Sequence, residues 1–164
     1  MTDTGAAGSK PIKRYYYEDL DVGQSIEVGS RRVTREEIVA FASAFDPQQH
    51  HLSDAGAAAT MVGRLCASGW HTCALFMRLL CDGFYNDAAG LGSPGMDEIR
   101  WLKPVFPDDT ITGRFTCVSR RPLASRPGVG LWIVDFEMKN QSAEVVMTWR
   151  STQLMAMRPV ETTA

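Results

Sequence analysis

Apolar side chains recur at helical spacing in the segment 34–46. The recurring positions are Ile38, Phe41, Ala42 and Phe45. Thr34, with Glu37 three residues later, has the pattern of a capping box, so we predict that a helix begins directly after Thr34. Pro47 disfavours helical geometry at the preceding residue, and the helix is therefore predicted to end at Asp46.

A second segment, residues 68–86, is apolar around most of its helical circumference. Its polar positions form one narrow stripe of His71, Arg78 and Asp82. On this stripe, His71 is expected to be a structural histidine held by a hydrogen bond. A helix this apolar has to be covered by other elements, so we predict a long central helix that the rest of the chain buries. A shorter helical piece is predicted from Ala55 to Val62.

Alternation of apolar and polar residues predicts strands in the remaining chain. The predicted strands are residues 25–33, 95–102, 109–121, 130–140 and 144–158. The positions expected on the covered face are Phe115, Cys117, Trp132, Val134, Phe136 and Met138. Such alternation favours an antiparallel sheet with one covered face. The fold class is therefore predicted to be α+β, a single domain whose antiparallel sheet wraps around the long central helix.

The chain has 164 residues, 45% of them hydrophobic, which is enough for one core. We assign residues 15–158 to the domain, residues 1–14 to a disordered N-terminal segment and residues 159–164 to a C-terminal tail.

Charge and composition exclude several classes of partner. Seventeen basic and nineteen acidic side chains leave a net charge of -2, without a dense basic run, so no nucleic acid partner is expected. Neither a signal peptide nor an apolar stretch of roughly 20 residues is present, so we expect a cytoplasmic protein without a membrane partner. No metal site is expected either, because His50, His51 and His71 contain no ligand pair at helical spacing.

The segment FDPQQHHLSD, residues 45–54, gathers acid-base groups. Asp46 and His51 are five positions apart, about 140° out of phase on a helix, so only a folded-back loop makes them neighbours. A converging carboxylate and imidazole would hold one water molecule and supply the proton transfers that hydration of a double bond requires. His50 is expected at a solvated loop position or in the wall of a substrate entrance.

The segment ASGW, residues 67–70, offers a donor for a developing oxyanion. Gly69 lets a reacting group approach the backbone N–H groups at the start of the long helix. Ser68 has two interpretations, a bond to the substrate carbonyl or a helix cap, and the cap is favoured. Trp70 either lines an acyl tunnel or belongs to the core, and the core is favoured.

These two segments resemble those of the MaoC-like dehydratases, in the family of (R)-specific enoyl-CoA hydratases with the hot-dog fold. The matching positions are Asp46, Gln48, His51 and Gly69. The stretches YEDLDVGQ, VTREEIVAFASAFD and GSPGMDEIRWLKPVFPDDT are similar as well, so the resemblance covers roughly residues 15–157. Gln49 stands where the family usually has proline, and His50 where it often has an apolar residue.

The resemblance implies syn addition of water to a trans-2-enoyl thioester, giving a (3R)-3-hydroxyacyl thioester, or the reverse reaction. Asp46 and His51 would activate the water, and the Gly69 N–H would bind the thioester carbonyl, with Ser68, Gln48 and Trp70 beside the substrate. The substrate would be a thioester of coenzyme A or an acyl carrier protein, and no cofactor is expected.

An uncovered sheet edge and helix flank favour a homodimer or a multiple of it. Met61 and Met77 either form an adaptable acyl pocket or simply fill gaps in the core, and gap-filling is favoured. Arg100 and Lys103 would either meet coenzyme A phosphates or lie at a solvated strand end.

Two other functions remain open on the sequence. A thioesterase of the same fold often carries a carboxylate on the central helix, where Asp82 is the only acidic residue and lies far from Gly69. A binding partner subunit without catalysis would have lost activity through Gln49 and His50.

Overall fold

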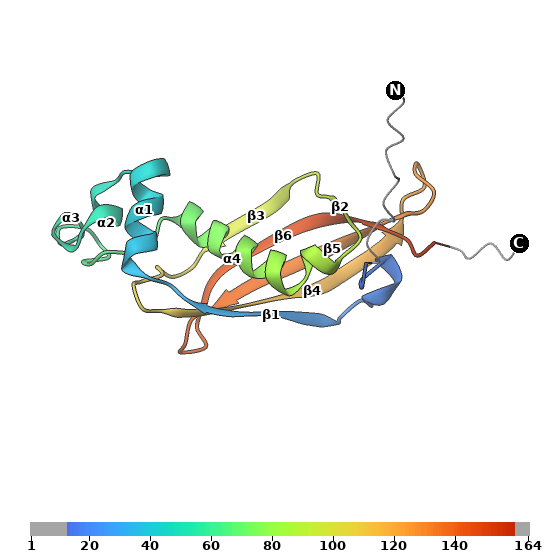
Figure 1. Ribbon diagram of the computed structural model, residues 1–164, viewed down its shortest axis with the longest axis horizontal. Helices are drawn as coiled ribbons and strands as arrows, with labels where there is room; N and C mark the ends of the chain where they lie inside the picture. The colour runs from blue at the N-terminus through green and yellow to red at the C-terminus, as the bar shows by residue number, and fades with distance from the viewer. Residues whose placement is uncertain (1–12, 160–164) are drawn as a thin grey trace, which may run out of the picture.

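A computed structural model describes residues 13–159 of the chain. One long helix lies across a curved antiparallel sheet, and three shorter helices gather beyond one end of it (Figure 1). The N-terminal segment and the C-terminal tail predicted from the sequence fall mostly on residues 1–12 and 160–164, outside the described residues. Arg14, which was assigned to the N-terminal segment, lies within the described residues, and its backbone N–H donates to the carbonyl of Asp87 at 2.7 Å.

The sheet has six strands and one interrupted edge. The strands are β1 (Ser25–Arg32), β2 (Gly90–Gly92), β3 (Met96–Trp101), β4 (Thr110–Pro122), β5 (Val129–Lys139) and β6 (Val145–Ala156). Their order is β1-β4-β5-β6-β2, and β3 also pairs with β6. β2 and β3 thus follow one another along the same side of β6. The α+β class and the five longer strands are confirmed, whereas β2 was missed because it is short and contains two glycines.

The helices are α1 (Arg35–Phe45), α2 (Gln49–Leu52), α3 (Asp54–Ala57) and α4 (Gly69–Gly83), with short 3-10 turns η1 (Tyr17–Asp19) and η2 (Tyr85–Asp87). The predicted capping box begins α1: Glu37 N–H donates to Thr34 Oγ1 at 3.2 Å, and Thr34 N–H donates to Glu37 Oε1 at 2.7 Å. Within residues 13–159, no helix is both long and apolar enough to cross a membrane.

The helical piece predicted from Ala55 to Val62 was wrong in its extent. α3 begins one residue earlier because the Ser53 hydroxyl caps it, accepting from Gly56 N–H at 3.0 Å. It ends at Ala57, whose carbonyl accepts both the N–H and the hydroxyl of Thr60, at 2.9 and 2.7 Å. α3 is therefore a single turn.

The core joins α4 to the middle of the sheet. Phe115, Phe136 and Trp149 are register partners on β4, β5 and β6, and all three are buried. Phe76 of α4 packs on them, with its ring centroid 4.7 Å from that of Trp149. Burying each of these side chains contributes about 1.5–3 kcal/mol. The central position predicted for the long helix is confirmed.

α4 is nevertheless uncovered on the side that borders β3. The exposed apolar side chains there are Trp70, Met77, Met96 and Trp101, which we call the α4–β3 flank. The interpretation of Trp70 as a core residue was wrong, because its side chain is 60% exposed. Figure 1 shows β3 running beside α4.

Only part of the predicted polar stripe of α4 is exposed to solvent. Arg78 and Asp82 are exposed and form an ion pair at 2.6 Å. His71 is instead buried, because α1 lies against that part of α4 and the ring of Phe41 stacks on the imidazole at 4.7 Å. The hydrogen bond expected for His71 is absent at Nδ1 among the described residues.

Candidate active site

Asp46 stands where α1 ends and the chain reverses. Its N–H donates to the carbonyl of Ala42 at 2.9 Å, closing the helix. Gln48 N–H then donates to Asp46 O at 2.7 Å, and His51 N–H to Gln48 O at 2.9 Å, so the chain turns directly into α2. The predicted reversal is confirmed. The short helical turn that carries His51 was not predicted, because four residues give too little periodicity.

Asp46 and His51 point toward one another. His51 Nε2 lies 3.6 Å from Asp46 Oδ2, beyond the length of a direct hydrogen bond. His51 Nδ1 lies 2.8 Å from the carbonyl oxygen of Cys66. Because a carbonyl only accepts, Nδ1 carries the hydrogen, and in the neutral ring Nε2 presents its lone pair to the carboxylate. Two acceptors therefore face each other across a short gap.

The Asp46 carboxylate receives two side-chain hydrogen bonds. Ser68 Oγ–H donates to Oδ2 at 2.6 Å, and Gln48 Nε2–H donates to Oδ1 at 2.7 Å. The bond from Ser68, and next that from Gln48, lowers the pKa of Asp46 below its ordinary value of 3.8. The carboxylate is therefore ionised at neutral pH.

Ser68 connects this carboxylate to the tip of α4. Its Oγ accepts from Trp70 N–H at 3.2 Å while its hydroxyl donates to Asp46. The cap interpretation is confirmed. The contact with Asp46 was missed, because the two residues are 22 positions apart and no local pattern links them. The carbonyl of Cys66 was missed too, since a backbone acceptor leaves no signal in the sequence.

Gly69 is the first residue of α4. The helix supplies no acceptor for N–H groups of its first turn, and its dipole favours negative charge there. The ring of Trp101 lies so close that a Cβ on Gly69 would stand 2.7 Å from Trp101 Cε2. Trp101 Nε1–H also donates to Gly69 O at 2.9 Å. Only glycine fits under this ring.

A cavity of about 250 Å³ opens beside this helix tip. Its lining is Val62, Ala67, Gly69, Thr72, Trp101, Leu102, Lys103, Pro104 and Val105. Asp46 and His51 are not among these residues. The segment 65–68 separates them from it: Cys66 bonds toward α2, whereas Ala67 N–H donates to Val105 O at 2.8 Å. The pair formed by Asp46 and His51, which we call the dyad, and the cavity thus lie on different sides of the tip of α4.

The remaining candidate residues lie around this centre. The half-buried ring of His50 packs against that of His51, with centroids 4.0 Å apart. Trp70 lies edge-on to Trp101 at 5.5 Å. The two candidates for contacts with coenzyme A phosphates already form ion pairs within the chain, Arg100 with Glu98 and Lys103 with Glu144. Met61 is fully exposed, whereas Met77 lines a cavity.

A family model described as "MaoC like domain" matches residues 20–130. The chain belongs to the MaoC-like domain family. Among curated proteins, it is 29% identical to the uncharacterized protein YdeM of Bacillus subtilis over 113 residues, covering 68% of this chain and 79% of YdeM. It is 31% identical over 108 residues to the protein MaoC of Klebsiella aerogenes, covering 63% of this chain but only 31% of that protein.

Solved structures place this MaoC-like chain in the hot-dog fold. A MaoC-like dehydratase from Rhodospirillum rubrum matches with a TM-score of 0.79 and 34% identity, covering 88% of this chain and 99% of the other. At fold level, the (R)-hydratase PhaJ1 of Pseudomonas aeruginosa matches with a TM-score of 0.67, 21% identity and coverages of 93% and 94%. Rv0216 of Mycobacterium tuberculosis, a double hot-dog protein, gives 0.75 and 17%, with coverages of 91% and 46%.

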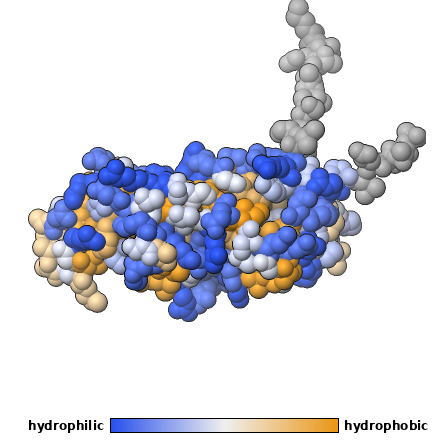
Figure 2. Space-filling view, turned by 90° about the horizontal axis from the view of Figure 1, so that it is seen from below, coloured by the Kyte–Doolittle hydropathy of each residue, from blue (hydrophilic) through white to orange (hydrophobic). Residues whose placement is uncertain are grey.

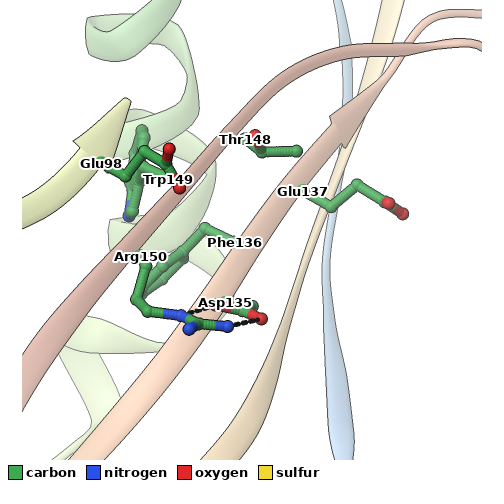
Figure 3. Close-up of a pocket in the computed structure, with 7 residues that line it drawn as sticks. All are labelled: Glu98, Asp135, Phe136, Glu137, Thr148, Trp149 and Arg150. Atoms are coloured by element: carbon green, nitrogen blue, oxygen red, sulfur yellow. Dashed lines mark hydrogen bonds and ion pairs between the residues drawn. The ribbon is translucent and has the colours of Figure 1, made fainter. Parts of the chain in front are cut away.

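The MaoC-like domain also has a hollow of about 320 Å³ on the outer face of the sheet (Figure 3). Asp135 and Arg150 cross it, joined by two hydrogen bonds of 2.5 and 2.7 Å. Phe136 and Trp149, which also line it, are buried in the core. The charges of the pair are already matched, and the hollow contains no residue of the dyad.

Proposed function

We propose that this MaoC-like protein adds water to a trans-2-enoyl thioester to give a (3R)-3-hydroxyacyl thioester, or catalyses the reverse reaction. One observation carries the proposal: the carboxylate of Asp46 and the Nε2 lone pair of His51 face each other at 3.6 Å. Both groups accept, so a water molecule that donates one O–H to each satisfies them together. Such a water has its oxygen lone pairs directed away from the dyad, toward a substrate.

The proposed reaction is balanced by water and thioester alone, so it needs no cofactor. The water oxygen bonds to Cβ and one of its hydrogens passes to the dyad, while the electron pair of the double bond moves toward the thioester oxygen. The Gly69 N–H stabilises the charge on that oxygen. The dyad then delivers a hydrogen to Cα, and the electron pair returns. A single amide donor of this kind is worth about 3–4 kcal/mol, and each acid-base group on the order of 10² to 10⁴ in rate.

Similarity to a MaoC-like dehydratase at 34% identity supports the proposal. Some structures of the same fold have names that describe this chemistry, among them an (R)-hydratase and a 3R-hydroxyacyl-ACP dehydratase complex. The carrier of the acyl group is proposed to be coenzyme A or an acyl carrier protein.

The test uses purified protein and crotonyl-CoA. The proposal expects the enoyl absorbance to fall without release of free thiol, and the product to be the (3R) enantiomer on chiral chromatography. An unchanged absorbance with crotonyl-, hexenoyl- and octenoyl-CoA would contradict it and favour a binding subunit. Formation of the (3S) product would contradict the proposed geometry.

Thiol release would instead indicate a thioesterase. The structure offers that reaction little support, because Asp82 is paired with Arg78 and lies thirteen residues, about 20 Å, along α4 from Gly69.

We further propose a homodimer formed through β3. This strand pairs with β6 on one side, and its other side has no strand partner among residues 13–159. The α4–β3 flank places exposed Trp70 and Trp101 beside that edge. By contrast, Figure 2 views the molecule from below relative to Figure 1, and the face that it shows is mostly hydrophilic. An exposed edge bordered by large apolar side chains is stabilised by pairing with a second copy.

Light scattering after gel filtration tests the homodimer. At micromolar concentration it should give twice the chain mass of 18.1 kDa, or a multiple of it, and a monomer would contradict the proposal.

A further inference from the structure

The carboxylate of Asp54, the first residue of α3, joins two segments that are distant in the chain. Its Oδ1 accepts from the backbone N–H of Leu65 at 2.9 Å, and its Oδ2 accepts from Nη2 of Arg35, the first residue of α1, at 2.7 Å. The bond from Leu65, and next that from Arg35, lowers the pKa of Asp54 below its ordinary value of 3.8. Asp54 is therefore a charged acceptor, which makes a stronger hydrogen bond than a neutral one.

The bond between Asp54 and Leu65 closes an exposed loop. After α3 ends at Ala57, residues 58–64 are mostly exposed, whereas the side chain of Leu65 is buried again. Asp54 and Leu65 are eleven positions apart in the sequence. A single carboxylate thus ties the end of the loop to the helix from which the loop departs.

The loop leads into residues 65–68, which we call the site segment and which are all buried. The carbonyl of Cys66 accepts from His51 Nδ1–H at 2.8 Å, and Ser68 Oγ–H donates to Asp46 Oδ2 at 2.6 Å. The site segment therefore contacts both members of the dyad. Because Cys66 is its second residue, a shift of its first residue displaces the carbonyl that holds His51.

The backbone N–H groups of the site segment bond to two different parts of the fold. Ala67 N–H donates to Val105 O, in the connection between β3 and β4, at 2.8 Å. On the helical side, the first N–H of the segment donates to Asp54 at 2.9 Å, and Cys66 N–H donates to His50 O at a long 3.3 Å. Without the bond to Asp54, this long bond and the bonds of the dyad itself would have to hold the segment against the helices.

The Cys66 carbonyl determines which ring nitrogen of His51 carries the hydrogen. Neutral histidine has two tautomers, and the hydrogen bond at one ring nitrogen selects between them. With Nδ1–H held by the carbonyl, Nε2 presents a lone pair toward Asp46, as the proposed water site requires. A displaced carbonyl would allow the other tautomer, in which Nε2–H donates to the Asp46 carboxylate in place of the water.

We propose that Asp54 is a positioning residue of this site: its bond to the site segment keeps the Cys66 carbonyl on His51 Nδ1 and so maintains the productive tautomer. Among residues 13–159 Asp54 has no hydrogen bond or ion pair with the dyad, so it acts through the segment. The inference rests on the proposed function where it concerns turnover, because it takes His51 as an acid-base group. Its effect on the tautomer does not depend on turnover.

Kinetics of two Asp54 variants test the role in turnover. Asp54→Ala removes the acceptor, whereas Asp54→Asn keeps an amide oxygen for Leu65 N–H and loses the charge. With crotonyl-CoA, Asp54→Ala should lower kcat about 10- to 100-fold and change KM less than about threefold, because a displaced acid-base group impairs the reaction more than binding. Asp54→Asn should keep kcat within about threefold of wild type.

The matched control is Arg35→Gln, which breaks the same ion pair and leaves the bond between Asp54 and Leu65. It should keep the wild-type kcat. Wild-type kcat in Asp54→Ala would overturn the inference. Equal losses of kcat in Asp54→Ala and Arg35→Gln would overturn it too, because the ion pair rather than the bond to the site segment would then be responsible.

The tautomer of His51 separates this inference from the proposed function. Two-bond ¹H–¹⁵N correlation spectra distinguish the tautomers, and the chain has three histidines, so comparison with His51→Gln identifies the signals of His51. At about pH 8, above the ordinary histidine pKa, wild type, Asp54→Asn and Arg35→Gln should show Nδ1–H, and Asp54→Ala a mixture of both tautomers.

Nδ1–H alone in Asp54→Ala would overturn the inference, even in a protein that hydrates crotonyl-CoA. The expected spectra in a protein that hydrates no enoyl thioester would support the positioning role of Asp54 and contradict the proposed function alone.

Discussion

The hydroxyl of Ser68 joins the carboxylate of Asp46 to the first turn of α4, donating to Oδ2 at 2.6 Å while accepting from Trp70 N–H at 3.2 Å. A single side chain therefore fixes the distance between the dyad and the helix tip.

Ser68→Ala should separate capping from catalysis. Loss of the cap should lower the free energy of unfolding by about 1 kcal/mol. Loss of the bond to a charged group should lower kcat/KM about 10- to 100-fold. Because the Ser68 bond lowers the pKa of Asp46, its removal raises that pKa, and the acid limb of the pH-rate profile should move to higher pH.

The matched control is Thr34→Ala, which removes the cap at the far end of α1. It should cost a similar free energy of unfolding in urea titrations and leave kcat/KM unchanged. Equal losses of activity in the two variants would show that Ser68 acts only through stability.

Gly69→Ala should disturb the helix tip through Trp101. The new Cβ would stand 2.7 Å from the indole, so the ring must shift, at an overpacking cost of about 1–3 kcal/mol in unfolding free energy. We expect kcat/KM with crotonyl-CoA to fall about tenfold or more. Adding Trp101→Ala, with the single Trp101→Ala as reference, should restore most of the lost stability, and wild-type activity in Gly69→Ala would contradict the assigned position.

His50→Phe should show the electrostatic effect of the second imidazole. The His50 ring lies 4.0 Å from that of His51, and positive charge on His50 lowers the pKa of Asp46. Phenylalanine keeps the ring contact but removes the charge, so protonation of the dyad becomes easier. The acid limb of kcat/KM should move to higher pH by less than about one unit. A shift in the opposite direction would contradict this account.

His71→Phe should make the fold less sensitive to acid. Burial lowers the pKa of His71 below its ordinary value of 6.5, so the folded state takes up its proton less readily than the unfolded chain. The stability of the wild type is therefore full above the unfolded pKa and falls as the pH drops from there toward the folded pKa. Phenylalanine preserves stacking on Phe41 and removes this titration. The fall in Tm between about pH 7.5 and about pH 5.5 should be smaller in the variant, and an unchanged fall would contradict the prediction.

Local patterns were sufficient for much of the fold. The capping box of Thr34 and Glu37, the end of α1 before Pro47 and the alternation in β4 and β5 each depend on neighbours in the sequence. Which side chains of α4 are buried was harder to predict. The burial of His71 and the exposure of Trp70 depend on which side of α4 faces α1 and which faces β3, and helical periodicity alone does not contain that information.

The candidate site, too, could be predicted only in part from the sequence. The resemblance of the loop, and not the spacing of Asp46 and His51, implied that the two side chains converge, and the structure places them 3.6 Å apart. The contact of Ser68 with Asp46 and the orientation of His51 by the Cys66 carbonyl were not predictable, because both join segments that are distant in the chain and one partner is backbone. The cavity that Met77 lines depends on the interruption between β2 and β3, and the sequence marks this interruption only by the turn residues Gly92, Ser93, Pro94 and Gly95.

The most direct measurement is crotonyl-CoA hydration by Asp46→Asn. Asparagine has nearly the same shape and keeps an acceptor for Ser68, so Tm should stay close to that of wild type. Because the amide neither accepts nor delivers the proton, kcat should fall on the order of 10² to 10⁴. A folded Asp46→Asn protein that hydrates crotonyl-CoA at the wild-type rate would contradict the central claim that this carboxylate and His51 together activate the water.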